Sequence, residues 1–287
     1  MKLSIVIPTR NRADTIGQQL DALARQQWTD WWEVVVADNG STDDTRATVE
    51  RHRSTLPNLR IVDAADRPGQ AYAMNVGAHA ARGEALLFCD DDDEVGEGWL
   101  MAMGRGLEQH RLVGCRWDID ALNHTRIRDG RGNPQSHGVQ QYSSPPYLPH
   151  TAGNSLGIHR DLHVTIGGFD EGIPISHDTD YCWRAQEAGA TLHFVGDAIV
   201  HVRFRKDLDE TFRQAIDYGR ASALLLKRHR PCGMPRASLR DAIGAWALLL
   251  LRVPRLARTR KRARWIWKLG WRLGRLDGSI RYRVVAF

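Results

Sequence analysis

The sequence is poor in cysteine and has no long hydrophobic run. Its four cysteines among 287 residues are widely and irregularly spaced and form no Cys-x-x-Cys pair. The pattern therefore indicates neither a zinc site nor a disulfide framework, and it fits a reducing cytoplasm best. The longest apolar stretch, residues 243–251, is about half of the roughly 20 residues that a membrane-spanning helix requires. The chain begins with a short apolar run at residues 1–8 and shows no basic region, long apolar stretch and small-residue cleavage site of a secretory signal there. We therefore expect a cytoplasmic protein that does not span a bilayer.

The chain does contain enough apolar residues for a core, and its charge is unevenly distributed. Apolar residues make up 42% of the sequence, which suits one large α/β domain or two small ones. Residues 236–287 hold 14 Lys and Arg against 2 Asp and Glu, a net charge of +12. Because the whole chain carries +6, the first 235 residues carry −6. The basic character therefore belongs to the C-terminal tail.

Apolar, β-branched runs alternate with helix-like segments in the first part of the chain. Strands are predicted at residues 2–8, 33–37, 59–62 and 85–89. Helices are predicted at residues 13–27 and 69–81, and a further helix follows the turn at 38–43 and continues to residue 52. This alternation predicts an α/β fold with a Rossmann-like, mainly parallel central sheet flanked by helices. Ligand sites in such sheets lie beyond the carboxyl ends of the strands, where the polar clusters of this sequence fall.

The second part of the chain is less regular. Residues 124–149 are rich in Gly, Pro, Ser, Asn and Gln and predict a long loop. A helix is predicted over 178–189 and short strands within 192–201. We expect one large domain over residues 1–235. A basic, amphipathic helical tail is expected over 236–287.

The run Asp90-Asp91-Asp92-Asp93 at the end of an apolar strand is the most informative feature. In an extended chain Asp90 and Asp92 face the same side, so both can approach one hard divalent cation such as Mg²⁺ or Mn²⁺. The alternative is a solvated acidic turn that binds no ion.

Three further residues can carry chemistry. Asp38, also at a strand end, is suited to accept hydrogen bonds from a nucleobase or ribose, although a capped turn without a ligand would contain the same residues. Asp178 can accept a proton from an acceptor hydroxyl, with helix capping as the alternative. His201 can complete a metal shell through its imidazole, although isolated histidines are usually structural or exposed.

Taken in order, these elements resemble glycosyltransferase family 2, whose members have the GT-A fold, over about residues 1–205. The similar segments are Ile7-Pro-Thr-Arg-Asn-Arg12, Asp38-Asn-Gly-Ser-Thr-Asp43, Gly69–Gly77 with Ala81–Gly83, Phe88–Glu94, and Gly167-Gly-Phe-Asp-Glu171 with His177–Arg184. Three positions differ from the usual family pattern: Arg10 replaces an aromatic residue, Met74 replaces an Arg, and His177 replaces a Glu.

The resemblance implies that residues 1–235 form the glycosyltransferase domain, with a nucleotide-binding half at about 1–95 and an acceptor and catalytic half at about 96–205. It also implies a role for each matching residue. Asp178 would be the catalytic base. The metal would be held by Asp90, Asp92 and His201, and Gly153, Asn154 and His177 would contact the donor sugar or the acceptor. The implied nucleotide-binding residues are Pro8, Thr9, Arg12, Asp38, Asn39, Gly69, Asn75, Asp90 and Asp91.

The implied activity is inverting transfer of a sugar from a nucleotide-diphosphate donor to an acceptor hydroxyl in a single in-line displacement, assisted by Mg²⁺ or Mn²⁺. A UDP-sugar is the favoured donor, with dTDP- and GDP-sugars as alternatives. The acceptor is a sugar, a lipid-linked compound or a small metabolite. One rival is a sugar nucleotidyltransferase, which needs a Gly-rich phosphate loop near the first strand that residues 8–12 do not provide. The other is a non-catalytic, membrane-associated scaffold, against which the set Asp38, Asp90, Asp92 and Asp178 argues.

The tail combines apolar, aromatic and basic residues, as in Leu248–Arg252, Arg258–Arg262 and Trp265–Trp271. Such segments commonly lie in a membrane interface, with Trp at headgroup depth and Lys or Arg facing anionic lipid. We therefore expect a peripheral protein on the inner face of the cytoplasmic membrane. The alternative is a helical hairpin packed on the protein itself. Nucleic acid is not an expected partner, because the chain contains no recognised nucleic-acid-binding module.

Overall fold

The computed structural model describes residues 1–287 with the exception of 57, 125–131, 205–206, 252, 254–258 and 287. The chain divides into two units. The first comprises residues 1–121, 134–140 and 149–203, and the second comprises residues 122–133, 141–148 and 204–287. The domain boundary expected at residue 235 stays a prediction.

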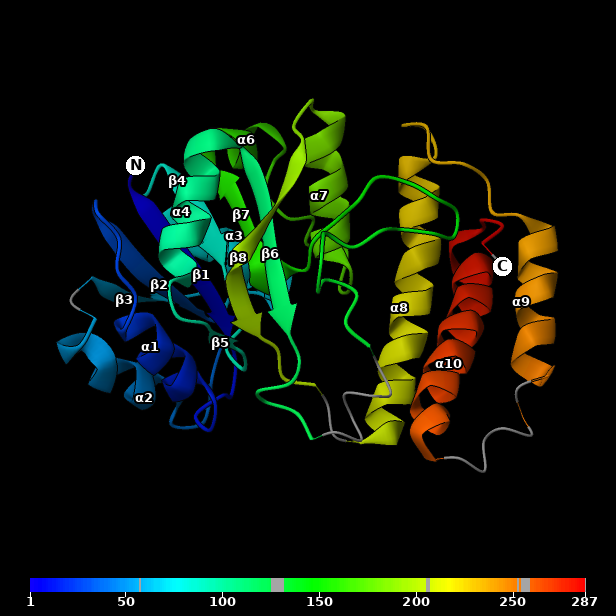
Figure 1. The fold of residues 1–287 in the computed structure, drawn as a ribbon, viewed down its shortest axis with the longest axis horizontal. Helices are drawn as coiled ribbons and strands as arrows, with labels where there is room; N and C mark the ends of the chain where they lie inside the picture. The colour runs from blue at the N-terminus through cyan, green and yellow to red at the C-terminus, as the bar shows by residue number, and fades with distance from the viewer. Residues whose placement is uncertain (57, 125–131, 205–206, 252, 254–258, 287) are drawn as a thin grey trace. The chain divides into compact units, whose positions relative to one another are not determined.

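The first unit has an α/β architecture with helices on both faces of one sheet (Figure 1). Among the described residues its strands are β1 (Leu3–Thr9), β2 (Trp32–Asp38), β3 (Leu59–Asp63), β4 (Ala85–Phe88), β5 (Glu94–Val95), β6 (Leu112–Asp118), β7 (Leu156–His159) and β8 (Leu192–His201). Its α-helices are α1 (Ile16–Ala24), α2 (Thr45–Arg51), α3 (Gln70–Ala80), α4 (Trp99–Gln109), α6 (Arg160–Thr165) and α7 (His177–Glu187).

The strand order of the sheet is β3-β2-β1-β4-β7-β6-β8-β5. The first four strands in this order pair in parallel, as the alternation of strands and helices predicted. β7 is antiparallel to both of its neighbours, and β5 is antiparallel to β8, so the sheet as a whole is mixed. The difference arises in the second half of the chain, where the sequence lacks the regular alternation that parallel connections require.

The parallel half of the sheet brings the ends of three strands together. β1 and β4 consist of buried residues throughout, and β2 does so after Trp32, which explains why these strands occupy the centre of the fold. The last residues of β1 and β2, Thr9 and Asp38, are directly paired in the register. β4 lies on the other side of β1, with Phe88 opposite Val6, and leads directly into the four aspartates. The polar clusters that follow these strands therefore share one edge of the sheet.

An aromatic cluster joins the turn at residues 167–170 and helix α7 to this edge. The rings of Phe169 and Tyr181 are stacked with their centroids 4.0 Å apart, and Phe88 meets Phe169 edge-on at 5.0 Å. His163 of α6 closes the cluster through a 2.6 Å hydrogen bond between its Nδ1 and the Tyr181 hydroxyl. Since Phe88 is the last residue of β4, these rings position α7 relative to the acidic run that follows β4.

The second unit contains three helices, α8 (Leu208–His229), α9 (Leu239–Leu251) and α10 (Thr259–Tyr282), among its described residues. α8 and α10 pack with their backbones in close contact, because glycines face the partner helix at the crossing. A Cβ added to Gly219 of α8 would overlap the backbone of α10, and one added to Gly274 of α10 would overlap the backbone of α8. This unit contains the helical C-terminal extension that the sequence predicted.

Several local predictions can be compared with these elements. The four N-terminal strands and the helix expected at 178–189 are present as β1 to β4 and α7. The short strands expected within 192–201 are one continuous strand, β8. β6 pairs with both ends of it, Leu192–Val195 and Ile199–His201, with a register shift after Cys115. Within the predicted loop 124–149, residues 125–131 lie outside the described residues, as does Arg258 of the basic segment in the tail.

Acidification is expected to destabilise the first unit through His163. Burial, together with the charges of Arg160 and Arg184, lowers the pKa of this imidazole from 6.5 to about 4. The folded state favours the neutral ring, so this contribution to stability is complete above pH 6.5 and is lost as the pH falls towards 4. His163→Gln removes the titrating group. The loss of unfolding free energy between neutral pH and about pH 4.5 should therefore be about 2 kcal/mol smaller in this variant.

The measurement is urea unfolding followed by circular dichroism at both pH values. His79→Gln, which replaces an exposed histidine of the same unit, is the matched control. An identical pH dependence in wild type and His163→Gln would show that His163 contributes nothing to acid sensitivity.

Candidate active site

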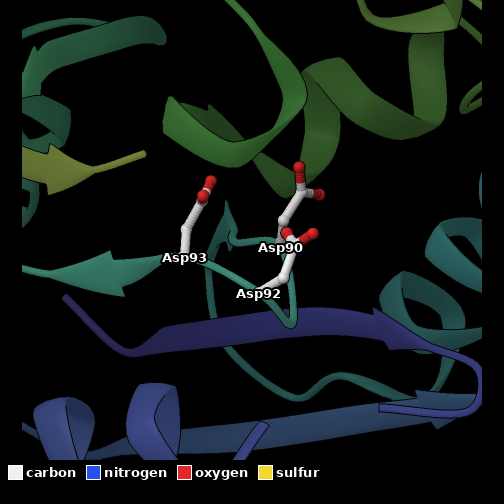
Figure 2. A group of neighbouring side chains, drawn as sticks. All are labelled: Asp90, Asp92 and Asp93. Atoms are coloured by element: carbon white, nitrogen blue, oxygen red, sulfur yellow. The ribbon is translucent and has the colours of Figure 1, made fainter. Parts of the chain in front are cut away.

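The acidic run forms a compact group of carboxylates in the loop that joins β4 to β5. Carboxylate oxygens of Asp90, Asp92 and Asp93 all lie within 4.8 Å of one another, the arrangement that a bound metal ion requires. Figure 2 shows the three side chains with their carboxyl groups pointing to the same side of the loop. Asp93 is buried, whereas Asp90 and Asp92 are partly accessible. The structure thus brings together both aspartates predicted as metal ligands, with Asp93 as a third member.

The electrostatics of this group favour a cation. Burial, followed by repulsion from Asp93 and Asp92, raises the pKa of Asp90 well above its ordinary value. Burial and the charge of Asp92 raise the pKa of Asp93 to about 7. Burial also raises the pKa of Asp91 to about 6, against the opposing effects of the Thr9 hydroxyl and of Arg12, whose Nε lies 3.3 Å from Asp91 Oδ1. Hard oxygen ligands whose negative charges repel one another are the donor set that Mg²⁺ and Mn²⁺ prefer, so these residues fit such an ion.

Asp93 is held in place by hydrogen bonds to both of its oxygens. The backbone N–H of Arg203 donates to Oδ1 at 2.7 Å, and Asn154 Nδ2 donates to Oδ2 at 2.5 Å. The Arg203 guanidinium also binds the carbonyl oxygen of Asp92 at 2.9 Å. Trp117 Nε1 donates to the amide oxygen of Asn154 at 3.1 Å, which fixes the orientation of that amide. Asp93 is therefore a structural anchor of the acidic loop, while Asp90 and Asp92 remain accessible to an ion.

A short 3₁₀ turn, η2 (Gly153–Ser155), connects this anchor to the predicted base. The N–H of Gly153 donates to Asp178 Oδ2 at 3.0 Å, and its neighbour Asn154 holds Asp93. Asp178 lies in the first turn of α7, where the N–H of Thr179 donates to its other oxygen at 2.7 Å. Asp178 is not the cap of α7, because Ser176 occupies the N-cap position; its side chain accepts an N–H of the first turn and remains partly exposed.

The opposite side of the site is built around the end of β2. Asp38 is 1% exposed; its Oδ1 accepts the N–H of Ser41 at 3.0 Å, and its Oδ2 lies 3.2 Å from Arg46 Nη1. Asn39 uses its whole amide to hold the following loop. Its Nδ2 donates to the carbonyl oxygens of Ala64 and Arg67, and its Oδ1 accepts the N–H of Gly69 at 2.9 Å. Gly69 has a φ of 141°, a conformation that favours glycine, immediately before α3.

Two more residues predicted to bind the nucleotide have structural contacts. Asn75 of α3 exchanges two 2.8 Å hydrogen bonds with the backbone of Phe169, so it holds the turn before α7. Thr9 and Pro8 are buried within β1, and the Thr9 carbonyl oxygen accepts the N–H of Asn39 at 2.8 Å. Whether these side chains also touch a nucleotide stays a prediction.

The two histidines of the predicted site lie in different surroundings. His177 is 6% exposed, its ring meets Phe169 edge-on at 5.8 Å, and burial lowers its pKa. Its Nδ1 has no hydrogen-bond partner among the described residues. His201 Nδ1 lies 2.7 Å from Asp118 Oδ2, and His201 is not a member of the carboxylate group of the described structure. Its role as a metal ligand stays a prediction.

Sequence patterns missed the residues that hold the acidic loop. Arg203 follows β8 and was not singled out, and Trp117 lies in β6, a strand that was not predicted. The available signal was Arg203 itself, a basic residue two positions after His201. A basic residue just after a strand can donate hydrogen bonds to a nearby acidic loop. Asn154 was identified, but as a contact to the sugar instead of a partner for Asp93.

A family model described as glycosyl transferase family 2 matches residues 4–167, more than half of the chain. The chain belongs to glycosyltransferase family 2. The match covers β1 to β7, including the acidic loop and η2, so it confirms the family that the sequence motifs indicated.

Curated and solved members of this class are similar to the chain at low identity. Glycosyltransferase AglE of Haloferax volcanii is 26% identical over 203 residues, which is 69% of this chain and 65% of that protein, so the chain spans slightly less than two thirds of its relative. The mannosyltransferase PcManGT of Pyrobaculum calidifontis, solved with GDP-Man and Mn²⁺, superimposes with a TM-score of 0.64 at 21% identity, covering 96% of this chain and 86% of that one. Residues 1–349 of Staphylococcus aureus TarS, solved with UDP-GlcNAc, give a TM-score of 0.58 at 21% identity, covering 100% and 93%. These structures confirm the GT-A fold.

Asn154→Ala is expected to destabilise this family 2 chain by about 2 kcal/mol, because it leaves an oxygen of the buried Asp93 without a donor. Asn154→Asp should cost more, since it places a second carboxylate against Asp93. The measurement is the midpoint and slope of urea unfolding at neutral pH. Asn58→Ala, which removes an exposed amide that donates to the Trp32 carbonyl oxygen, is the control. Equal stabilities of Asn154→Ala and wild type would contradict the anchoring role of Asp93.

Proposed function

We propose that this chain is a glycosyltransferase that moves a sugar from a nucleotide-diphosphate donor to an acceptor hydroxyl, with inversion at the anomeric carbon. The observation that carries the proposal is a connection between the cluster of three aspartates and Asp178. It runs through two consecutive residues, Gly153, which bonds to Asp178, and Asn154, which bonds to Asp93. A site for a diphosphate leaving group and a proton acceptor at fixed separation is what a single in-line displacement requires. The activities in the names of AglE, PcManGT and TarS support the same class of reaction.

The donor proposed is a UDP-sugar, with dTDP- and GDP-sugars as alternatives. Asp38 offers an acceptor oxygen next to the Arg46 guanidinium, a donor, at a distance of 3.2 Å. The imide edge of uracil or thymine presents an N–H beside a carbonyl oxygen and complements such a pair. The UDP-GlcNAc bound by TarS supports a uridine donor, whereas the GDP-Man bound by PcManGT supports the guanosine alternative.

Mg²⁺ or Mn²⁺ is the proposed cofactor, with Asp90 and Asp92 as the ligands that the acidic loop provides and His201 as a further proposed ligand. When bound, the ion would supply positive charge beside the diphosphate, which becomes more negative as the sugar leaves. Arg12 contributes a second positive charge at this place, since its guanidinium lies 3.9 Å from Asp92. The Mn²⁺ in the PcManGT complex supports a divalent ion.

Asp178 is the proposed catalytic base. Its two oxygens each accept a backbone N–H, which orients the carboxylate and leaves further lone pairs for the acceptor hydroxyl. The proton moves from that hydroxyl to Asp178 as the new glycosidic bond forms and the bond to the diphosphate breaks. His177, next in the chain, lines the same turn and is proposed to face the sugar or the acceptor. The acceptor proposed is a sugar, a lipid-linked compound or a small metabolite that carries a free hydroxyl.

Asp92→Asn is expected to weaken nucleotide binding at least about tenfold, because one charged ligand of the ion is lost. Calorimetric titration of UDP, dTDP and GDP, with and without Mn²⁺, measures the change in nucleotide affinity and identifies the preferred nucleobase. Asp197→Asn, which changes an exposed acidic residue of β8, is the matched control. If no nucleotide binds under any condition, the chain is a non-catalytic scaffold with a GT-A fold.

Asp178→Asn is expected to lower the rate of transfer by a factor of about 100 or more while leaving the affinity for the nucleotide unchanged. The rate is measured as nucleotide release from a panel of UDP-sugars with Mn²⁺, with water or simple sugars as acceptors. Affinity is measured by the same calorimetry. A variant that retains the wild-type rate would exclude Asp178 as the base, and one that loses nucleotide affinity as well would indicate a structural role.

A further inference from the structure

Helix α9 has an apolar surface that the rest of its unit does not cover. Residues 242–251 contain no charged side chain. Only Ala242 and Leu249 of this helix are buried, on one side. Leu239, Ile243 and Leu250, which recur at spacings of four and seven residues, are 57%, 61% and 66% exposed, and Leu251 is 73% exposed. A continuous exposed apolar face of this kind is unusual on a soluble surface and indicates an interaction site.

The Trp-rich helix α10 is not the source of this surface. Gly270, Gly274 and Gly278 place the α10 backbone against α8, and Trp267 packs on Tyr218 at 5.7 Å. Trp265 of α10 donates its Nε1 hydrogen to the Leu249 carbonyl oxygen at 2.9 Å, on the buried side of α9. The glycine-lined side of α10 therefore packs on α8 and its Trp265 supports α9, whereas α9 exposes a run of apolar side chains at regular helical spacing.

Positive charge surrounds the apolar face. Arg236 and Arg240 are exposed at the N-terminal end of α9. Arg262 and Arg264 are exposed at the start of α10, next to the Trp265 that contacts Leu249. The tail as a whole carries +12. An apolar strip with basic residues at both ends matches the interface of a bilayer that contains anionic lipid, where apolar side chains enter the headgroup region and Arg pairs with phosphate.

We propose that α9 docks this chain on the surface of a bilayer rich in anionic lipid, lying in the plane of the interface. The 13 residues of α9 measure about 20 Å in length, less than the roughly 30 Å of a hydrocarbon core. Consistent with this orientation, none of the helices in the described ranges is both long and apolar enough to cross a membrane. A second copy of the chain is a less suitable occupant, because it would bring two tails of +12 together.

The test is co-sedimentation of the full chain with phosphatidylcholine vesicles, with and without about one third of phosphatidylglycerol. Wild type should bind the anionic vesicles at least about tenfold more strongly than the neutral ones, and high salt should weaken that binding. The double variant Ile243→Gln/Leu250→Gln should bind the anionic vesicles at least about tenfold more weakly than wild type. Val164→Gln, which changes a 68% exposed apolar residue of α6, is the matched control and should bind like wild type.

Circular dichroism and thermal unfolding of the double variant establish that it is folded, which is expected because both side chains are exposed. The proposal is overturned if wild type stays in the supernatant with anionic vesicles, or if the double variant binds as wild type does. It is also overturned if sedimentation velocity without vesicles shows a dimer that the double variant dissociates, since the face would then bind a second copy. None of these results depends on sugar transfer.

Discussion

The arrangement of the site depends on the cost of placing several carboxylates at the end of a buried strand. Asp90, Asp92 and Asp93 repel one another, and burial strengthens the repulsion, as the raised pKa values of Asp90 and Asp93 indicate. The fold compensates by giving Asp93 two donors, the backbone of Arg203 and the amide of Asn154. These two hydrogen bonds stabilise the charged form of Asp93 and hold its side chain in place, so the loop keeps Asp90 and Asp92 partly accessible, with Arg12 as the nearby positive charge.

The same requirement explains why three asparagine side chains fix the loops of the site. Asn39 holds the loop before α3, Asn75 holds the turn before α7, and Asn154 holds Asp93. An amide side chain suits this task because it donates and accepts at once and carries no charge into an already acidic region. Neutral amide side chains thus fix the loops that carry the carboxylates of the candidate site.

The sequence predicted the parallel half of the fold and the grouping of Asp90 and Asp92, because both have local signals. Apolar β-branched runs between turn residues identified β1 to β4, and charged residues directly after buried strands identified Asp38 and Asp90. The partners of Asp93 could not be predicted in the same way. Arg203 is separated from Asp93 by 110 positions, and it meets Asp93 only because β8 pairs with β5. The antiparallel strand β7 was also missed, since its four residues have no periodicity to detect.

The turn η2 makes the two halves of the proposed chemistry mechanically dependent on each other. Gly153 is bonded to the base and Asn154 to the acidic loop, and one peptide unit cannot stretch. A displacement of the acidic loop when a donor binds would therefore be passed to Asp178, and an acceptor that shifts Asp178 would act on the loop in return. In such a site the binding of one substrate would affect the binding of the other through two hydrogen bonds and the peptide unit between them.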